Sequence, residues 1–456
     1  MGHDDGVQFP IGDGDTRSSL ATGRAVFADA ARADDPALAE RIASCGDWRT
    51  AYVELMPELL ERDVAGSGLQ ALHARLVHVR GRDERPLREA FSVPPARTLP
   101  TDVLRGEGEP VRELALPAGD QVLRGDDLRR RLDDWVAAGV IEPGAATGVS
   151  EVLEHPEWLA LEGRRIVLVG AGAEMGPLEP LAAWGADVLA VDLPSQAQRI
   201  RGLARAGSGT VRMPGDGADL LTELPELRAW IGEHDDGRPL VVASHVYSDG
   251  AAHVRLAAAA DLLVADLPGA AYAALATPTD CYLVPDDAVE EARRRWRRRG
   301  VGRVLRVASG GRLLRPAYAR RRLADGIVRQ QGPNYALAKR AQRWRAVVAA
   351  REGRAVSLNL APATTTRSVM RNRVLAAAYA GARRFGVEVF PPATTRVLMA
   401  ALLVRDLHRA APPDDPDAAL AESAVHGGLW RIPYDLRSAL PLAALGGLPR
   451  SLLRRP

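Results

Sequence analysis

Several residue types and patterns are scarce or missing in this chain of 456 residues, and each absence excludes a class of protein. Two cysteines, Cys45 and Cys281, are too few for a disulfide framework or a cysteine-based zinc site. No apolar run is long enough to span a bilayer, and the acidic N-terminus lacks the apolar segment of a signal peptide. We therefore expect a cytoplasmic protein.

Neither sign of charge predominates. The chain has 60 basic and 58 acidic residues, which leaves a formal net charge of +2 and no general attraction for nucleic acid or an anionic membrane. The main basic run, "EEARRRWRRRG" at 290–300, is expected to be a solvated helix end rather than a nucleic-acid site. The sequence therefore predicts a small-molecule substrate, and neither nucleic acid nor a membrane as a partner.

Lysine and asparagine are nearly absent, as expected from a gene rich in G and C. Lys339 is the only lysine, and the three asparagines stand at 334, 359 and 372, so all four residues fall in one short window. Arginine keeps its proton and presents a planar fork, whereas an ammonium is a compact charge whose pKa moves with its surroundings. We therefore expect Lys339 to serve chemistry that arginine cannot.

The remaining composition, with 46% hydrophobic and 26% charged residues, is that of a globular protein. Its length predicts two or three domains. Apolar residues at helical spacing predict a mainly helical N-terminal domain over residues 1–155, in which we find no catalytic motif. A Rossmann-like catalytic domain is expected over 156–410. The linker "APPDDPD" then introduces a helical appendage over 411–456.

Strands alternate with helices from residue 164 onward. "RRIVLVGAGAEMGPLEPLAAWGADVLAVDLP" contains a buried strand, a glycine-rich turn, a helix and a second strand. Further strand candidates are "TVRMPGD", "RPLVVASHV", "GRVLRVASGG", "RAVSLNLAP" and "GVEVFPP". This alternation predicts an α/β fold with a doubly wound, mainly parallel sheet.

The glycine-rich turn has the context of a dinucleotide site. Gly170, Gly172 and Gly176 open the helix after the first strand, and Asp192 ends the second. Glycine permits close approach of a pyrophosphate to helix-terminal N–H groups, and the acid accepts hydrogen bonds from a ribose. Two alternatives remain open. The glycines could serve only helix–strand packing, or the turn could belong to a methyltransferase.

Tyr335 and Lys339 are four residues apart in a helix-compatible stretch, so their side chains share one face. A nearby ammonium favours the phenolate and lowers the pKa of a tyrosine. Such a tyrosine can exchange a proton with a carbonyl or alcohol oxygen near neutral pH.

In these features the chain resembles the short-chain dehydrogenase/reductase family. It has a glycine-rich first turn, then Tyr-x-x-x-Lys as "YALAK", then the proline- and threonine-containing "LAPATTT" after a strand. The resemblance implies that Tyr335 is the catalytic acid/base and that Lys339 lowers its pKa and binds the nicotinamide ribose. Pro362 and Thr364 to Thr366 would border the nicotinamide. Ser309 is the candidate catalytic serine.

Further residues are assigned to the cofactor or compete with that assignment. Three further residues are candidate contacts of the cofactor. Asp216 lies in the expected strand "TVRMPGD", Ser244 lies in the expected strand "RPLVVASHV", and Thr366 lies in the loop "LAPATTT". Glu174 stands where the family has its middle glycine, so that a carboxylate would face the phosphates unless it turns away or finds a cation.

Three other patterns have both a functional and a structural interpretation. His245, Asp249 and His253 stand at four-residue intervals, but we expect a loop beside the cofactor rather than a metal site. Arg340, Arg343 and Arg345 either hold an anionic group or face solvent. "APATTTRSVM" and "PPATTRVLMA" repeat one another after predicted strands, as a ligand-binding pair or as simple helix caps.

The sequence thus predicts an oxidoreductase that moves hydride between a nicotinamide cofactor and a carbonyl or alcohol carbon. Asp192 would repel a ribose 2′-phosphate, so NAD is favoured over NADP. The family resemblance implies a homodimer or homotetramer. Alternatives are an epimerase, dehydratase or lyase with tightly bound NAD, a non-catalytic nucleotide-binding protein, and an enzyme that forms a Schiff base at Lys339.

Overall fold

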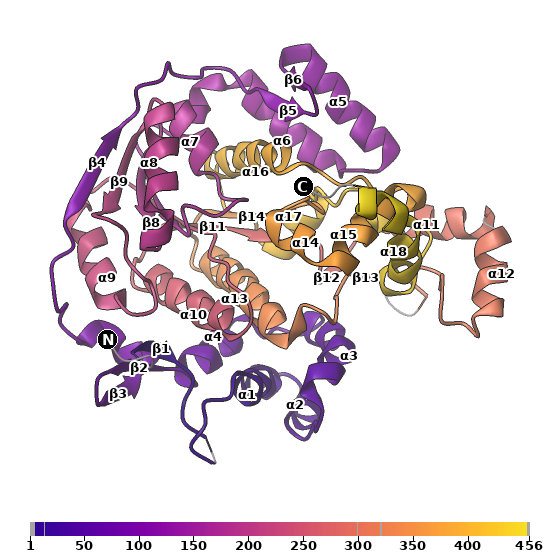
Figure 1. Ribbon diagram of the computed structural model, residues 1–456, viewed down its shortest axis with the longest axis horizontal. Helices are drawn as coiled ribbons and strands as arrows, with labels where there is room; N and C mark the ends of the chain where they lie inside the picture. Colours follow the sequence, from indigo (N-terminus) through magenta and orange to yellow (C-terminus); the bar gives the residue numbers. More distant parts are fainter. Residues whose placement is uncertain (1–4, 13, 299, 320–321, 454–456) are drawn as a thin grey trace.

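The computed structural model describes residues 5–12, 14–298, 300–319 and 322–453. A seven-stranded sheet runs through its centre (Figure 1) in the order β14-β11-β10-β7-β8-β9-β4. All neighbouring strands are parallel except β9 and β4. In sheet order the strands are Val356–Leu360, Ala271–Ala276, Leu240–Ser244, Arg165–Val169, Asp187–Val191, Thr210–Pro214 and Thr101–Arg105.

The six parallel strands follow the order 3-2-1-4-5-6 when they are numbered along the chain from β7, so the order reverses between β7 and β10. At such a reversal the loops at the carboxyl ends of the strands part and leave a crevice for ligands. The strands are near-continuous apolar runs because helices cover both of their faces, and every residue of β7 is buried. The α/β class with a mainly parallel sheet is confirmed, and it is compatible with a Rossmann-like fold.

Helices form a layer on each face of the sheet (Figure 1). Side chains alternate along β7: Ile166 and Leu168 belong to one apolar cluster, and Val167 and Val169 belong to the other. The first cluster is covered by α6 (Pro143–Glu154), α7 (Leu178–Trp184), α8 (Ala197–Ala206) and α16 (Pro392–Leu407). The second is covered by α9 (Leu224–Glu233), α10 (Ala251–Ala265) and α13 (Gly332–Arg351).

The first 155 residues contribute to both sides of the sheet and to its edge. Their first four helices pack outside α10 and α13, and Gly68 lies so close to the ring of Trp344 that a Cβ would be 2.6 Å from it. Those helices are α1 (Ser19–Ala31), α2 (Pro36–Ala43), α3 (Trp48–Leu60) and α4 (Ala65–Ala74). Strand β4 then joins the central sheet. The division of the chain into three domains stays a prediction.

Smaller elements complete the N-terminal 160 residues. A three-stranded antiparallel sheet joins β1 (Gly6–Gln8), β2 (Val77–Arg80) and β3 (Asp83–Pro86). The hairpin of β5 (Leu116–Ala118) and β6 (Gln121–Leu123) leads into α5 (Gly125–Ala138), on the α6 side of the molecule. The 3-10 helices η1 (Leu87–Ser92) and η2 (Pro156–Ala160) belong to this part of the chain, and η3 (Pro194–Gln196) follows β8.

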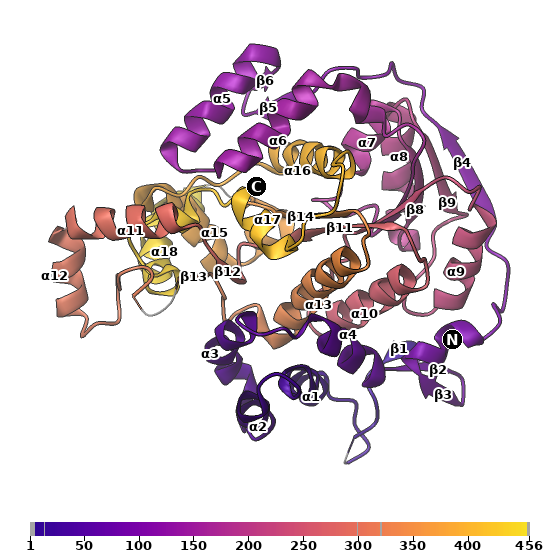
Figure 2. The same ribbon diagram turned by 180° about the vertical axis from the view of Figure 1, so that it is seen from behind.

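An insertion between β11 and α13 and the C-terminal segment pack together at one end of the molecule (Figure 2). The insertion holds β12 (Cys281–Leu283), α11 (Asp286–Arg298), α12 (Gly300–Ala308) and β13 (Leu323–Asp325). After β14 follow α14 (Arg367–Arg371), α15 (Arg373–Gly381), η4 (Ala382–Phe385), α16, α17 (Pro416–Glu422), η5 (Leu429–Arg431) and α18 (Leu436–Leu453). Among the described residues, no helix combines the length and apolar composition needed to cross a bilayer.

Two predicted strands are wrong, and two strands of the central sheet, β4 and β11, were not predicted. "GRVLRVASGG" lies largely in α12, because the apolar positions 304 and 307 also share one face of a helix. "GVEVFPP" forms only a single bridge, between Phe390 and Thr364. Strand β11 is alanine-rich, a composition with low strand propensity, and β4 lies within a stretch rich in proline and glycine.

Candidate active site

Tyr335 and Lys339 face the carboxyl end of β11 from one side of α13. The phenol of Tyr335 donates a hydrogen bond of 2.9 Å to Thr277 Oγ1, directly after the strand. The Lys339 ammonium donates to the carbonyl oxygen of Leu275 at 3.3 Å and to Gln342 Oε1 at 3.0 Å. The prediction that the two residues share one face of a helix is confirmed. We call the group of Thr277, Tyr335, Lys339 and Gln342 the Tyr335 site.

Buried ion pairs fix α13 against the sheet. Arg340 and Arg343 donate to the two carboxylate oxygens of Asp280, at 2.6 and 3.1 Å. One turn further, Arg345 makes a two-point contact with Asp261 on α10, at 2.6 and 2.9 Å. All three arginines are buried. They neither face solvent nor point to an external anion, because removing such charges from water requires partners as close as these.

The electrostatics of the Tyr335 site differ from the expectation that Lys339 lowers the pKa of the phenol. Burial raises the pKa of Tyr335, and its hydrogen bonds with Thr277 and Thr279 oppose that rise. Burial also lowers the pKa of Lys339 to about 8, while the charge of Asp280 raises it. A low-polarity environment disfavours both the phenolate and the ammonium. The lysine therefore exchanges its proton much closer to neutrality than an exposed lysine does.

Two histidines lie beside the lysine. Burial, followed by the charge of Lys339, lowers the pKa of His245 and of His253 to about 3, so both rings are neutral. The ring of His253 lies 5.5 Å from that of Tyr335, measured between centroids. Within the described part of the chain, no three or more His, Cys, Asp or Glu side chains are grouped so that they could hold a metal ion.

The glycine turn lies across the strand-order reversal from the loop after β10. Gly170 has a φ of +83°, and a Cβ there would lie 2.8 Å from the backbone of His245. The N–H of Gly172 donates to Asp192 Oδ2 at 2.7 Å, and the other oxygen accepts from Leu193 N. Two contacts inside the protein therefore already hold the carboxylate that was expected to bind a ribose. Close packing accounts for Gly170, and Gly176 is buried in the same turn.

The Glu174 carboxylate is paired with a cation, the guanidinium of Arg367. The carboxylate accepts a hydrogen bond of 2.9 Å from the backbone N–H of Arg367, and the Arg367 guanidinium lies 3.5 Å away. Arg396 donates to the Glu174 carbonyl at 3.1 Å and pairs with Glu179 at 2.6 Å. Polar contacts with Glu174 therefore join the segment after β14 to the glycine turn.

The two threonine-rich loops lie side by side. Thr364 Oγ1 and Thr395 Oγ1 are 2.9 Å apart, and Thr364 also donates to the carbonyl of Pro362. Thr366 is the N-cap of α14. These contacts support the interpretation of the threonines as turn and cap residues, although the loop that holds them borders the carboxyl edge of the sheet.

The structure does not bring the remaining predicted site residues to Tyr335. Ser309 follows α12, which projects at the far end of the molecule (Figure 1), and its hydroxyl contacts Arg306 O and Leu313 N. Asp216 is 90% exposed and pairs with Arg201. Ser244 is the buried last residue of β10. Thr277 occupies the place expected for Ser309, and only recognition of the alanine-rich strand before it would have revealed it.

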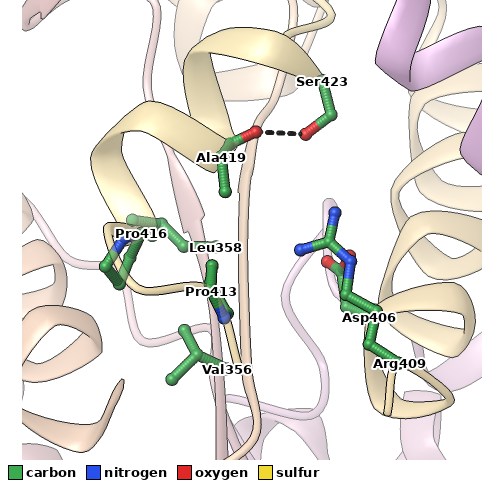
Figure 3. A pocket seen from close by; sticks show the side chains of 8 residues that line it. All are labelled: Val356, Leu358, Asp406, Arg409, Pro413, Pro416, Ala419 and Ser423. Carbon is green, nitrogen blue, oxygen red and sulfur yellow. Dashed lines mark hydrogen bonds and ion pairs between the residues drawn. The ribbon is translucent and has the colours of Figure 1, made fainter. Parts of the chain in front are cut away.

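Two small cavities lie near β14. One lies beneath the glycine turn. It is lined by Met175 of that turn and by His245, Leu275, Asn359 and Arg396. Met399, Ala400 and Leu403 of α16 also line it, so it lies on the face of the sheet opposite α13. The other lies between β14 and α17 (Figure 3), where Arg409 points toward the buried Asp406. No residue of the Tyr335 site lines either of these two cavities.

Comparisons with known proteins do not identify the chain. No family model matches it, and no curated protein sequence matches it. The argument for function therefore rests on the strand order and on the side chains at the carboxyl edge of the sheet.

Proposed function

We propose that this protein is a nicotinamide-dependent oxidoreductase of the short-chain dehydrogenase/reductase type, acting on a carbonyl or alcohol group of a small molecule. The observation that carries the proposal is the hydrogen bond from Tyr335 to Thr277 at the carboxyl edge of a parallel sheet. Lys339 lies one helical turn away on the same face, and the glycine turn borders the strand-order reversal, where such sheets bind ligands.

The residues at this edge fit a dinucleotide in their chemistry. The cavity beneath the glycine turn is lined by Met175 and Leu275 on the α16 side of the sheet. On the α13 side, buried Gln342 Nε2 has no hydrogen-bond partner among the described residues. Lys339 and Gln342 would hold the ribose next to the nicotinamide, and the loop from Pro362 to Thr366 would border its ring. When bound, the nicotinamide would accept or supply the hydride.

The chain's own residues would handle the proton. Tyr335 would donate its phenolic proton to a carbonyl oxygen, or accept one from an alcohol, while the Thr277 hydroxyl fixes the phenol's orientation. Thr277 Oγ1 lies 3.0 Å from Thr279 Oγ1, so the phenol is connected to a short chain of hydroxyl groups. Lys339, with a pKa of about 8, would favour the phenolate while it remains protonated.

Native mass spectrometry of the purified protein, followed by fluorescence titration with NADH and NADPH, tests this proposal. We expect binding of NADH, and weaker binding of NADPH because of Asp192. Tyr335→Phe should leave NADH affinity within about twofold and abolish turnover of any carbonyl substrate, because only the proton donor is lost. Absence of binding to either nucleotide would end the proposal. Copurified NAD without net turnover would favour an epimerase, dehydratase or lyase.

A second function is favoured by one observation at the same site. In the described part of the chain, Lys339 contacts no carboxylate, and its pKa is about 8, so a fraction of its amine is neutral and nucleophilic near neutral pH. Such an amine would condense with a carbonyl compound to form an imine and release water. Borohydride reduction followed by peptide mass measurement would detect the adduct at Lys339, and Lys339→Arg is the control.

A further inference from the structure

A basic arm projects from the end of the molecule that holds the insertion. It comprises α11 and α12 and runs from Asp286 to Ala308, and both views show α12 standing away from the central sheet (Figures 1 and 2). Its inner side is anchored: the ring of Trp296 meets that of Tyr434 at 5.9 Å, and a Cβ on Gly302 would lie 2.9 Å from Tyr434.

The arm carries a local charge that the balanced net charge of the chain conceals. From Asp286 to Ala308 the sequence contains eight arginines and four acidic residues, and all four acidic residues precede the first arginine. Several of the arginines are exposed and form no ion pair within the described part of the chain, namely Arg294, Arg297, Arg298, Arg303 and Arg306. This is a concentrated positive potential on a protruding element, and it attracts an anionic partner.

Exposed apolar side chains stand among these arginines. Val304, Leu305 and Val307 are 68%, 40% and 80% exposed. Val304 and Val307 are three residues apart and therefore share a face of α12, next to Arg303 and Arg306. Isolated exposed apolar residues need no explanation, but a group of three at the tip of a cationic arm indicates a surface that is covered in use.

We propose that the outer face of α12 binds the surface of a bilayer that contains anionic lipids. A convex helix with arginines beside short apolar side chains fits a headgroup layer, where the guanidinium groups meet lipid phosphates and the aliphatic groups enter the acyl boundary. A nucleic acid would use the arginines but not the three apolar side chains. This inference goes beyond the proposed function and does not depend on it.

Sedimentation of the full chain with vesicles tests the inference. We expect it to bind vesicles of phosphatidylcholine mixed with phosphatidylserine at least about tenfold more tightly than vesicles of phosphatidylcholine alone, and to lose binding as salt rises. Val304→Asp with Val307→Asp, and Arg303→Gln with Arg306→Gln, should each weaken binding about tenfold or more. Matched controls on other surfaces are Val103→Asp with Val122→Asp, and Arg82→Gln with Arg112→Gln, which should bind as the natural chain does.

Circular dichroism of each variant shows whether it is folded, and all the substituted side chains of the arm are exposed. The inference is overturned if the natural chain ignores anionic vesicles, or if the control variants lose binding as much as the arm variants do. It is also overturned if a DNA duplex binds the arm and the two valine substitutions leave that binding intact. A dimer that only the arm variants dissociate, without vesicle binding, would assign the face to a second copy of the chain.

Discussion

The Tyr335 phenol and the Thr277 hydroxyl, 58 residues apart in sequence, are joined by a hydrogen bond of 2.9 Å. One belongs to α13 and the other follows β11, so the contact links a helix to the carboxyl end of the strand it packs on. Thr277 is 8% exposed, and its hydroxyl is one of the groups that limit the rise in the pKa of Tyr335 caused by burial.

Removing this hydroxyl should raise the pKa of Tyr335 further. Thr277→Val keeps the shape of the side chain but leaves the phenol without its partner, whereas Thr277→Ser keeps the hydrogen bond. Ultraviolet difference titration, with Tyr335→Phe subtracted to isolate this phenol, measures the change. Equal titration curves for the valine and serine variants would show that the contact does not act on the phenol.

Loss of the Glu174 charge should strengthen dinucleotide binding. Glu174→Gln frees the Arg367 guanidinium and removes a carboxylate from the glycine turn, so NADH affinity should rise by up to about fivefold, the size expected for a partly exposed ion pair. The measurement is fluorescence titration at low and high salt. Glu179→Gln, which removes the partner of Arg396, is the matched control and should have a smaller effect. Unchanged or weaker NADH binding by Glu174→Gln would contradict this role.

The amine of Lys339 should react near neutral pH. Burial lowers its pKa to about 8, so acylation at this position should be half-maximal near pH 8 instead of near the ~10.4 of a free lysine. Because the chain has a single lysine, peptide mass spectrometry separates this amine from the N-terminus without ambiguity. Reaction that begins only above pH 10 would mean that the amine is not buried as described.

Asp406 should make the protein less stable as the pH rises. Burial raises the pKa of Asp406 to about 6, so its protonated form is favoured in the folded state. Its contribution is fully present below the unfolded pKa of 3.8 and is lost as pH rises through about 6, up to ~3 kcal/mol. The free energies of unfolding of the natural chain and of Asp406→Asn, measured in urea from pH 4 to 7, should diverge by up to this amount. Asp216→Asn, at an exposed position, is the control.

Replacing the Asp280 carboxylate with a neutral side chain should lower the free energy of unfolding far more than the same change at a surface carboxylate. Asp280→Asn leaves the buried guanidinium groups of Arg340 and Arg343 without their shared charge, which should destabilise the fold by about 3–5 kcal/mol. Asp236→Asn, which removes an exposed carboxylate paired with Arg238 and Arg165, is the matched control and should destabilise the fold far less. Urea unfolding curves compare them, and equal losses would show that the buried pair does not hold α13.

The sequence predicted the features that depend on residues close to one another in the chain. The four-residue spacing placed Tyr335 and Lys339 on one face of α13, and the apolar runs located five of the six parallel strands. Strand β11 was not predicted, because an alanine-rich segment does not distinguish a strand from a helix. Thr277, which follows this strand, was therefore not predicted as a site residue. Ser309 follows "VLRVA", which was expected to be a strand, but those residues form α12.

Periodicity among near neighbours was enough to predict the alternating helices and strands, the parallel sheet and the Tyr335–Lys339 pair. The ion pairs of Asp280 and Asp261 with three buried arginines could be seen only in the folded chain. The same is true of the contact between Glu174 and Arg367, and of the burial that raises the pKa of Tyr335. The physical reason is that desolvation and pairing depend on which distant segments meet, and the spacing of residues along one chain does not specify such meetings.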